Sequence, residues 1–333
     1  MMNMPPMEEL DIKDRQIIWN LTVNSRQSFA KIAKKVKLSK EAVNYRVKRL
    51  TEKKIIRGYY ALIDPSALGL MSARFFIKFQ HATPKIEKEL IEYYTKNPQT
   101  GWTVSRGGEY DFGAQFWGKN ISELYREKKE MLDRFRPYIK EVSLGIYHKI
   151  HFFDRKYLIG NKKETLHATL CASEKVEVDE LDLRILTTIS ADARLSIPEI
   201  AQKLNEHPHI INYRLKKLNG PVIKGFLLMA DWEKIGCTWS KITLTLDEYK
   251  EIDKIINFCS SHSKVTSAYE MLNGGGDLEI EIETKSREEL REFLEELMEK
   301  FTSSIRYYDY FDWAKEHKAI FMPLVELEKN KTS

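Results

Sequence analysis

Hydrogen-bonding and basic side chains gather on one face of a short segment near residue 45. Apolar residues recur at helical spacing over residues 39–53. A rotation of about 100° per residue then turns Asn44, Tyr45 and Lys48 away from the apolar face. A helix of this kind fits the DNA major groove, where amide or basic side chains bond base edges and any of the three can reach a phosphate. The pattern predicts a DNA-reading helix with Ser39 as its N-cap.

The same pattern occurs again 168 residues further along the chain, where Asn-Tyr-Arg is repeated at residues 212–214. A solvated helix face used for protein contacts is the alternative interpretation of either copy. A β-hairpin is predicted at 55–63, directly after the first of these helices. This hairpin and the repetition itself favour DNA contacts over protein contacts. The candidate DNA contacts are Ser39, Lys40, Glu41, Asn44, Tyr45, Arg46, Lys48, Arg49, Arg57, Asn212, Tyr213, Arg214, Lys216 and Lys217.

These two helices belong to a tandem duplication. Residues 11–50 align with residues 179–218 without a gap. The second copy then loses one residue, after which Gly58 meets Gly225. The chain therefore repeats a unit of roughly 165 residues. A polar segment at 161–177 is the predicted linker.

Each unit predicts two domains. Three short helices and a β-hairpin at 55–63, turning at Gly58, are typical of a winged helix-turn-helix. Strand and helix periodicities then alternate in the order βαββαβ, which is ferredoxin-like. The predicted fold class is α+β, with two winged helix-turn-helix domains alternating with two ferredoxin-like domains. The predicted bounds are 8–64, 65–160, 178–231 and 232–326, with elements of the ferredoxin-like domains at 74–79, 84–96, 101–106, 110–117, 120–135, 141–153, 240–246, 248–260, 265–272, 277–284, 286–300 and 304–313.

Charge distinguishes the two copies. The whole chain has a formal net charge of only +5. Residues 11–60 contain 14 basic and four acidic side chains, whereas residues 179–228 contain seven basic and six acidic ones. Because phosphate neutralisation supplies most non-specific affinity for DNA, we expect the first module to dominate attachment. The second would be an auxiliary reader.

The composition and the residue patterns argue against several other classes of protein. No stretch of the 333 residues approaches the run of about 18–20 apolar residues that a membrane helix needs. The first residues lack the order of a signal peptide, and three cysteines form neither a CxxC pair nor an even framework. We expect a cytoplasmic protein with no cofactor and no metal. No Ser-His-Asp set, acid–base carboxylate pair or phosphate loop stands out, so we expect no enzyme activity.

Two further polar features have competing interpretations. Glycines precede an aspartate between the second and third strands of each ferredoxin-like domain. They either form a hairpin turn or let backbone amides approach a metabolite whose ammonium the carboxylate would bind. Alternating acidic residues at 279, 281 and 283 predict a solvated strand face. Such a face could instead repel DNA from the second ferredoxin-like domain or dock on the basic first module. The candidate effector residues are Gly107, Gly108, Asp111, Gly274, Gly275, Gly276 and Asp277.

Three motifs follow one another in the first unit: Arg-Val-Lys-Arg-Leu at 46–50, Ile-Arg-Gly-Tyr at 56–59 and Asp64-Pro65 followed by Gly69. With these motifs the first unit resembles the Lrp/AsnC (feast/famine) transcription regulators. The resemblance implies a regulator that binds double-stranded promoter DNA, pairs through its α/β domains, forms higher oligomers and responds to amino acids or related metabolites. The second unit matches less closely, since Trp232 replaces the proline.

The duplication modifies these expectations. One chain would be a covalent pseudo-dimer that reads an asymmetric site, and two such chains would form the homo-oligomer. A co-regulator that docks proteins and does not bind DNA is one alternative. A siroheme-decarboxylase-like enzyme of the same architecture is another, although residues 111–117 lack the Asn-x-Trp-Phe strand of those enzymes.

Overall fold

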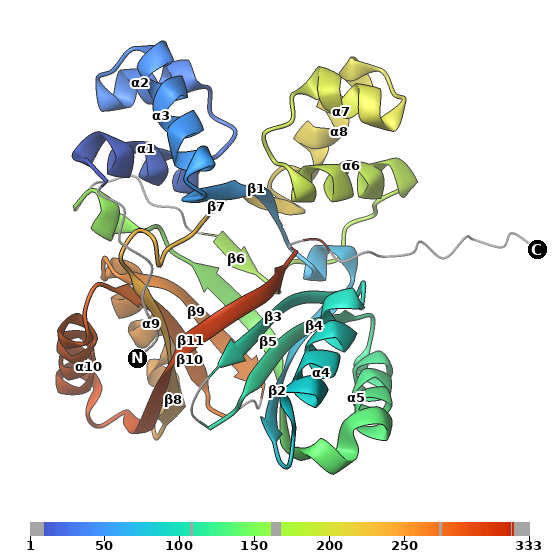
Figure 1. Ribbon diagram of the computed structural model, residues 1–333, viewed down its shortest axis with the longest axis vertical. Helices are drawn as coiled ribbons and strands as arrows, with labels where there is room; N and C mark the ends of the chain where they lie inside the picture. Colours follow the sequence, from blue (N-terminus) through green and yellow to red (C-terminus); the bar gives the residue numbers. More distant parts are fainter. Residues whose placement is uncertain (1–9, 107–108, 161–167, 273–274, 321, 323–333) are drawn as a thin grey trace, which may run out of the picture.

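The computed structural model describes residues 10–106, 109–160, 168–272, 275–320 and 322. Two helix-turn-helix modules lie on the same side of a β-barrel (Figure 1). Within the described ranges, no helix is both long and apolar enough to cross a membrane. The helices of the modules are α1 (Ile12–Val23), α2 (Phe29–Val36) and α3 (Lys40–Glu52), and α6 (Glu180–Ala191), α7 (Ile197–Leu204) and α8 (Pro208–Leu218).

Short polar residues begin these helices. The Ser39 hydroxyl accepts a hydrogen bond from the Ala42 amide at 3.0 Å, so the predicted N-cap of α3 is present. Ser196 caps α7 reciprocally with Glu199. In α8 the cap is His207, followed by Pro208 at the first helical position. The N-cap of the second recognition helix is therefore a histidine, whereas that of the first is a serine.

Both ferredoxin-like domains have the predicted βαββαβ order, and the fold class is confirmed. The first contains β2 (Met71–Phe79), α4 (Pro84–Lys96), β3 (Thr100–Arg106), β4 (Phe112–Gly118), α5 (Ile121–Phe135) and β5 (Ile139–Phe152). The second contains β8 (Thr238–Leu246), α9 (Ile252–Ser261), β9 (Val265–Leu272), β10 (Leu278–Thr284), α10 (Arg287–Phe301) and β11 (Ile305–Ala319). A short strand, β6 (Ala168–Leu170), pairs with β5 inside the segment predicted as linker.

The two four-stranded sheets join into one closed barrel. The strand order is β2-β4-β3-β11-β8-β10-β9-β5, and β5 also pairs with β2. The first half of β5 pairs with β2 and its second half with β9; β11 likewise pairs with β8 and then β3. Closure removes the free edges that would otherwise invite aggregation. The prediction ended β11 at 313, too early, because the last part of this strand belongs to the partner sheet.

The predicted hairpin at 55–63 is replaced by a single strand. β1 (Ile56–Ile63) pairs antiparallel with β7 (Ile223–Ala230), with Tyr60 opposite Leu227. Gly58 lies within β1 and makes no turn. The two units thus share a two-stranded ribbon between the helical modules and the barrel (Figure 1).

Each helical module uses the ribbon strand of the other unit to complete its core. Leu228 and Ala230 of β7 pack in the core of the first module, which includes Ile17 and Val43. Ala61 and Ile63 of β1 pack in the core of the second. Hydrogen bonds cross in the same reciprocal way: the Ala193 amide donates to the Tyr59 carbonyl, and the Ser25 amide to that of Phe226. Neither module has a complete core on its own.

Leu228 belongs to the second unit in sequence but packs in the core of the first helical module. Leu228→Ala should therefore destabilise the first module. Leu228 is 3% exposed, and truncating a buried leucine costs about 2–5 kcal/mol through lost burial and the cavity left behind. We expect faster amide hydrogen exchange in α1 and α2 than in α6 and α7. Leu272→Ala, at a side chain that is 67% exposed, is the control. Equal acceleration in both modules would contradict the reciprocal packing.

Candidate nucleic-acid interface and barrel interior

The recognition helix α3 presents a polar face to solvent. Asn44, Tyr45 and Lys48 are exposed, as predicted, and so are Lys40 and Glu41. Val43, Val47 and Leu50 are buried on the opposite face. Tyr45 is 67% exposed, an unusual position for a large aromatic side chain with no packing role. The face is free to contact a partner surface.

Helix α8 repeats this face. Asn212, Tyr213 and Lys216 are exposed, and Tyr213 is 66% exposed. Lys217 is exposed too, although its ammonium lies 3.9 Å from the Asp182 carboxylate. The two helices therefore offer matched trios of residues in different electrostatic surroundings.

Three arginines among the candidate DNA contacts have a structural role. Arg46 Nη1 lies 2.9 Å from Asp14 and 2.7 Å from Asp11, and Arg49 Nη2 lies 2.5 Å from Asp14. Asp14 is 1% exposed. In the second module Arg214 binds Asp179 and Asp182 in the same way, at 2.5 and 3.2 Å. These ion pairs hold the recognition helix against the first helix of its module. They therefore position the exposed face of the recognition helix, which we call the reading face.

Arg57, another candidate DNA contact, forms an ion pair with the barrel. Its guanidinium lies 3.2 Å from the Glu316 carboxylate of β11. Glu316 also accepts a hydrogen bond from the Trp102 indole at 3.2 Å. Burial raises the pKa of Glu316, while Arg57 acts in the opposite direction. Arg57 therefore links the ribbon to the barrel.

Lysines surround the first reading face more densely than the second. Around α3, exposed lysines occupy positions 31, 34, 35, 37, 40, 48, 53 and 54. Around α8 the exposed lysines at 203, 216 and 217 are accompanied by the acidic side chains Glu199 and Glu206. The charge difference predicted from sequence is thus a difference between two exposed surfaces.

The candidate effector loops hold their aspartates in intramolecular hydrogen bonds. The Asp111 carboxylate accepts from the Phe79 amide at 2.8 Å and from Lys78 Nζ at 3.0 Å. Asp277 accepts from the Leu246 amide at 2.8 Å. Both contacts tie the loop to the end of a neighbouring strand, which is what the turn interpretation requires.

Local backbone geometry also explains why two positions of the second loop are glycine. Gly275 has a φ of +102°, a conformation that favours glycine. A Cβ at Gly276 would lie 2.8 Å from the Leu244 carbonyl oxygen. Gly107, Gly108 and Gly274 lie outside the described residues.

A cavity of about 380 Å³ lies between the barrel and the β1–β7 ribbon. Leu62 and Leu227 line it from the ribbon, and Trp102, Trp239 and Trp313 from the barrel strands. Both units contribute to both walls. Sequence reasoning missed this cavity, because its residues come together only when the two sheets close.

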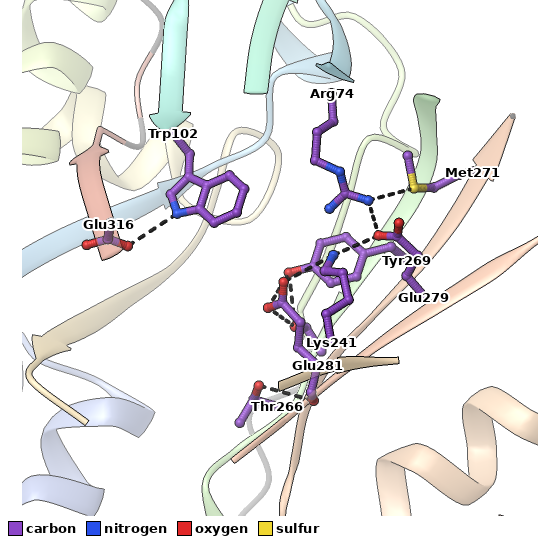
Figure 2. Close-up of polar contacts among 10 residues, drawn as sticks. Arg74, Trp102, Lys241, Thr266, Tyr269, Met271, Glu279, Glu281 and Glu316 are labelled. Carbon is purple, nitrogen blue, oxygen red and sulfur yellow. Dashed lines mark hydrogen bonds and ion pairs between the residues drawn. The ribbon is translucent and has the colours of Figure 1, made fainter. Parts of the chain in front are cut away.

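The barrel interior contains a buried ionic network (Figure 2). The Arg74 guanidinium of β2 reaches across the barrel to the Glu279 carboxylate of β10. Lys241 Nζ lies 2.7 Å from Glu279 and 3.2 Å from Glu281. Glu281 also accepts a hydrogen bond from the Tyr269 hydroxyl at 2.7 Å. Two cations and two carboxylates therefore neutralise one another away from water.

Glu279, Glu281 and Glu283 were predicted to form a solvated strand face, and this is wrong. They are 1%, 6% and 2% exposed. Arg155 donates two hydrogen bonds to Glu283, at 2.8 and 2.9 Å. Burying carboxylates is tolerated because each finds a cation or hydroxyl partner. The alternation of acidic and apolar residues in β10 was a real signal, but the polar side faces the barrel interior.

The pKa shifts follow from this arrangement. Burial would raise the pKa of Glu279, but the charges of Arg74 and Lys241 outweigh it and lower that pKa. The pKa of Lys241 is lowered, because burial and the nearby Arg74 both disfavour its charged form. The network therefore depends on Glu279 staying ionised.

Glu279→Gln should destabilise the protein by about 3–5 kcal/mol, because it leaves Arg74 buried without its carboxylate partner. Urea unfolding measures the change. Glu288→Gln on the surface of α10 is the control and should have little effect. Adding Arg74→Met to Glu279→Gln should restore part of the loss. A Glu279→Gln protein as stable as the parent would contradict the role of this pair.

Comparison with known proteins agrees with the helical modules and the fold. The model of the AsnC-type helix-turn-helix domain matches residues 10–51 and 178–219. An uncharacterised HTH-type transcriptional regulator of Pyrococcus furiosus is 33% identical over 124 residues, covering 37% of this chain and 83% of that protein. The HTH-type transcriptional regulator Ptr1 of Methanocaldococcus jannaschii is 47% identical over 60 residues, covering 18% of this chain and 40% of that protein.

Similarity to solved structures extends over nearly the whole chain. The siroheme decarboxylase NirDL superposes with a TM-score of 0.63 and 15% identity, covering 94% of both chains. Identity this low shows a common fold and nothing about shared chemistry. The sequence matches and the duplicated helical modules together settle the family: the chain belongs to the Lrp/AsnC transcriptional regulators, with the helix-turn-helix domain of that family present twice.

Proposed function

We propose that this protein is a sequence-specific regulator that binds double-stranded promoter DNA mainly through its first helix-turn-helix module. The observation that carries the proposal is the exposed Asn44, Tyr45 and Lys48 face of α3, set among exposed lysines. Asn pairs with adenine edges, Lys with guanine, and the tyrosine hydroxyl reaches phosphate. Residues of this kind specify bases and fix register.

The first module provides most of the affinity. Each phosphate that a lysine neutralises releases counterions, so attachment depends on how many cations the module presents. The second module has seven basic and six acidic side chains over residues 179–228, against 14 and four in the first over residues 11–60. The second helix reads DNA only while the first holds the chain there.

The site on DNA is an asymmetric pair of half-sites. Both modules lie on the same side of the barrel, joined by the ribbon (Figure 1). A helix-turn-helix pair of this kind reads half-sites one helical turn apart, or a multiple of that. One chain supplies both recognition helices. A dimer of such chains would bring two copies of the first, more basic module together. We place this assembly in the cytoplasm.

An amino-acid-like effector would act at the loops that contain Asp111 and Asp277. Glycine in these loops lets backbone amides approach a ligand closely. Binding there would compete with the bonds that Asp111 makes to Lys78 and Phe79. An effector would therefore shift the ends of β2 and β8.

An enzyme like siroheme decarboxylase is the less favoured alternative. A carboxylate-rich tetrapyrrole needs a large and strongly basic site. The cavity here measures about 380 Å³, and its lining includes six acidic and four basic residues. A co-regulator that docks proteins and does not bind DNA is the remaining alternative, and it is distinguished by experiment.

Replacing Asn44, Tyr45 and Lys48 together by Ala should weaken binding to a promoter fragment at least tenfold, since base and phosphate contacts are both lost. The matched control replaces Asn212, Tyr213 and Lys216, and should lose less than about threefold because this helix adds little affinity. Arg46 and Arg49 are left intact, because they hold α3 in place. Fluorescence anisotropy at several salt concentrations measures both.

Equal losses from the two triple variants would contradict the dominance of the first module. If the parent protein did not bind DNA even at low salt, the co-regulator would be favoured.

A further inference from the structure

Two arginines at corresponding positions link the helical modules directly to each other. Arg26 lies in the turn after α1, and Arg194 lies 168 residues later, in the turn after α6. Arg26 Nη1 donates a hydrogen bond to the Ala193 carbonyl at 2.6 Å. Arg194 Nη1 donates to the Ser25 carbonyl and, at 3.3 Å, to the Gln27 carbonyl. We call this reciprocal pair of contacts the arginine clasp.

The accepting carbonyls lie just beyond the ends of the first helices. α1 ends at Val23 and α6 ends at Ala191. The C-terminal end of a helix carries a partial negative charge, so a cation is stabilised there. Each guanidinium of the clasp therefore lies where the first helix of the other module favours its charge.

The two guanidiniums are held in the clasp without carboxylate partners. Within the described residues neither forms an ion pair, and both side chains are half-buried. Burial lowers the pKa of both arginines, and the charge of Arg194 lowers that of Arg26 further. Desolvation and like charge are both unfavourable for a cation. The clasp therefore holds only while both guanidiniums keep their carbonyl and aromatic partners.

Arg194 forms the stronger half of the clasp. Its guanidinium lies 4.3 Å from the ring centroid of Phe29 and 5.3 Å from that of Tyr59. Arg26 has one such contact, at 5.3 Å from the ring centroid of Phe226. Cation–π contacts add to the two carbonyl bonds of Arg194. Loss of Arg194 should therefore weaken the link between the modules more than loss of Arg26.

Polar contacts run from one recognition helix to the other through the clasp. In the first module, Asp14 of α1 binds Arg46 and Arg49 of α3. In the second module, Asp182 of α6 binds Arg214 of α8. The clasp joins the end of α1 to the end of α6, so the two helices that hold α3 and α8 are also held to each other. A module that swings about the ribbon must break the bonds of the clasp.

We propose that Arg26 and Arg194 are positioning residues that restrict the swing of the two recognition helices relative to each other. The ribbon places the two modules, and the clasp limits how far either module turns about it (Figure 1). On DNA, a narrow range of helix separations means that the protein accepts half-sites at one spacing and rejects others. This consequence for DNA rests on the proposed function, whereas the restriction itself does not.

Double electron–electron resonance on the full chain, without DNA, measures the restriction. Spin labels at Lys34→Cys and Gln202→Cys, which are exposed and corresponding positions on α2 and α7, report the distance between the modules. Cys171→Ser removes the half-buried native cysteine, and the other two are buried. The otherwise unchanged chain should give one narrow distance distribution. Adding Arg194→Met should broaden it about twofold, because a hinge motion is released, and Arg26→Met should broaden it less.

Arg184→Met is the matched control. Arg184 donates to the Leu204 carbonyl at 2.8 Å within the second module, so this variant loses a bond of the same kind and leaves the clasp intact. The distance distribution should stay narrow even if urea unfolding shows a loss of stability. An unchanged width in Arg194→Met, or equal broadening in Arg184→Met, would overturn the proposal.

Arg194→Lys decides the question if Arg194→Met proves unfolded by circular dichroism. Lysine keeps the positive charge but lacks the planar guanidinium that stacks on Phe29 and Tyr59. The distance distribution should then be broader than in the parent. A width equal to that of the parent would overturn the proposal in this variant too.

Binding to DNA tests the consequence for spacing. The probe is the duplex that the parent chain selects from random DNA, with its half-sites as selected or moved apart by two base pairs. Moving them should weaken binding of the parent about tenfold and binding of Arg194→Met less than about threefold. Equal penalties in the two proteins would refute the role in spacing. If the parent selects no sequence, the proposed function fails, while the spin-label distances still decide whether the clasp restricts the modules.

Discussion

The pairing of β1 with β7 is the interaction on which the rest of the structure depends. Each strand runs from its own helical module toward the barrel, yet packs into the core of the other module. The modules therefore cannot separate from one another without exposing apolar surface on both. Because the strands continue into the barrel domains, the spacing of the two recognition helices is set by the same contact.

Covalent duplication has allowed the two halves to diverge in a way that identical subunits could not. If both halves had the second sequence, six carboxylates would face one barrel interior. Instead, Gly113, Gln115 and Trp117 occupy the positions that correspond to Glu279, Glu281 and Glu283. The first half also supplies Arg74 and Arg155 as cations. The acidic interior of one half is thus stable only beside the other.

The same divergence extends to the surface. Asn-Tyr-Arg is retained in both recognition helices, but the lysines around the first are replaced by a mixed surface around the second. The arginine of the tripeptide binds the buried Asp14 in one module and Asp182 in the other. Both copies keep this arginine although the charge of the surrounding surface differs between them. The reason is that the arginine holds the recognition helix against the first helix of its module.

Local patterns predicted most of the elements, and the failures share one cause. Helical and strand periodicity identified the three-helix modules and both βαββαβ domains, because each pattern reflects burial within its own domain. The hairpin at 55–63, the end of β11 and the burial of Glu281 were misjudged, because their partners lie in the other unit. The ion pairs of Arg46 and Arg49 with Asp14 were not predicted, because nothing in the local sequence shows that Asp14 lies beneath them. Closing the barrel and exchanging the ribbon strands are long-range events that periodicity does not encode.

Selection of bound sequences from random double-stranded DNA tests the central claim most directly, because it reports binding, half-site spacing and asymmetry together. The account predicts one strongly specified half-site beside a weakly specified one at a fixed helical spacing. Replacing Asn44 should erase the strong half-site and leave the weak one unchanged. A palindrome with two equally specified halves for a single chain, or no enriched sequence at all, would contradict it.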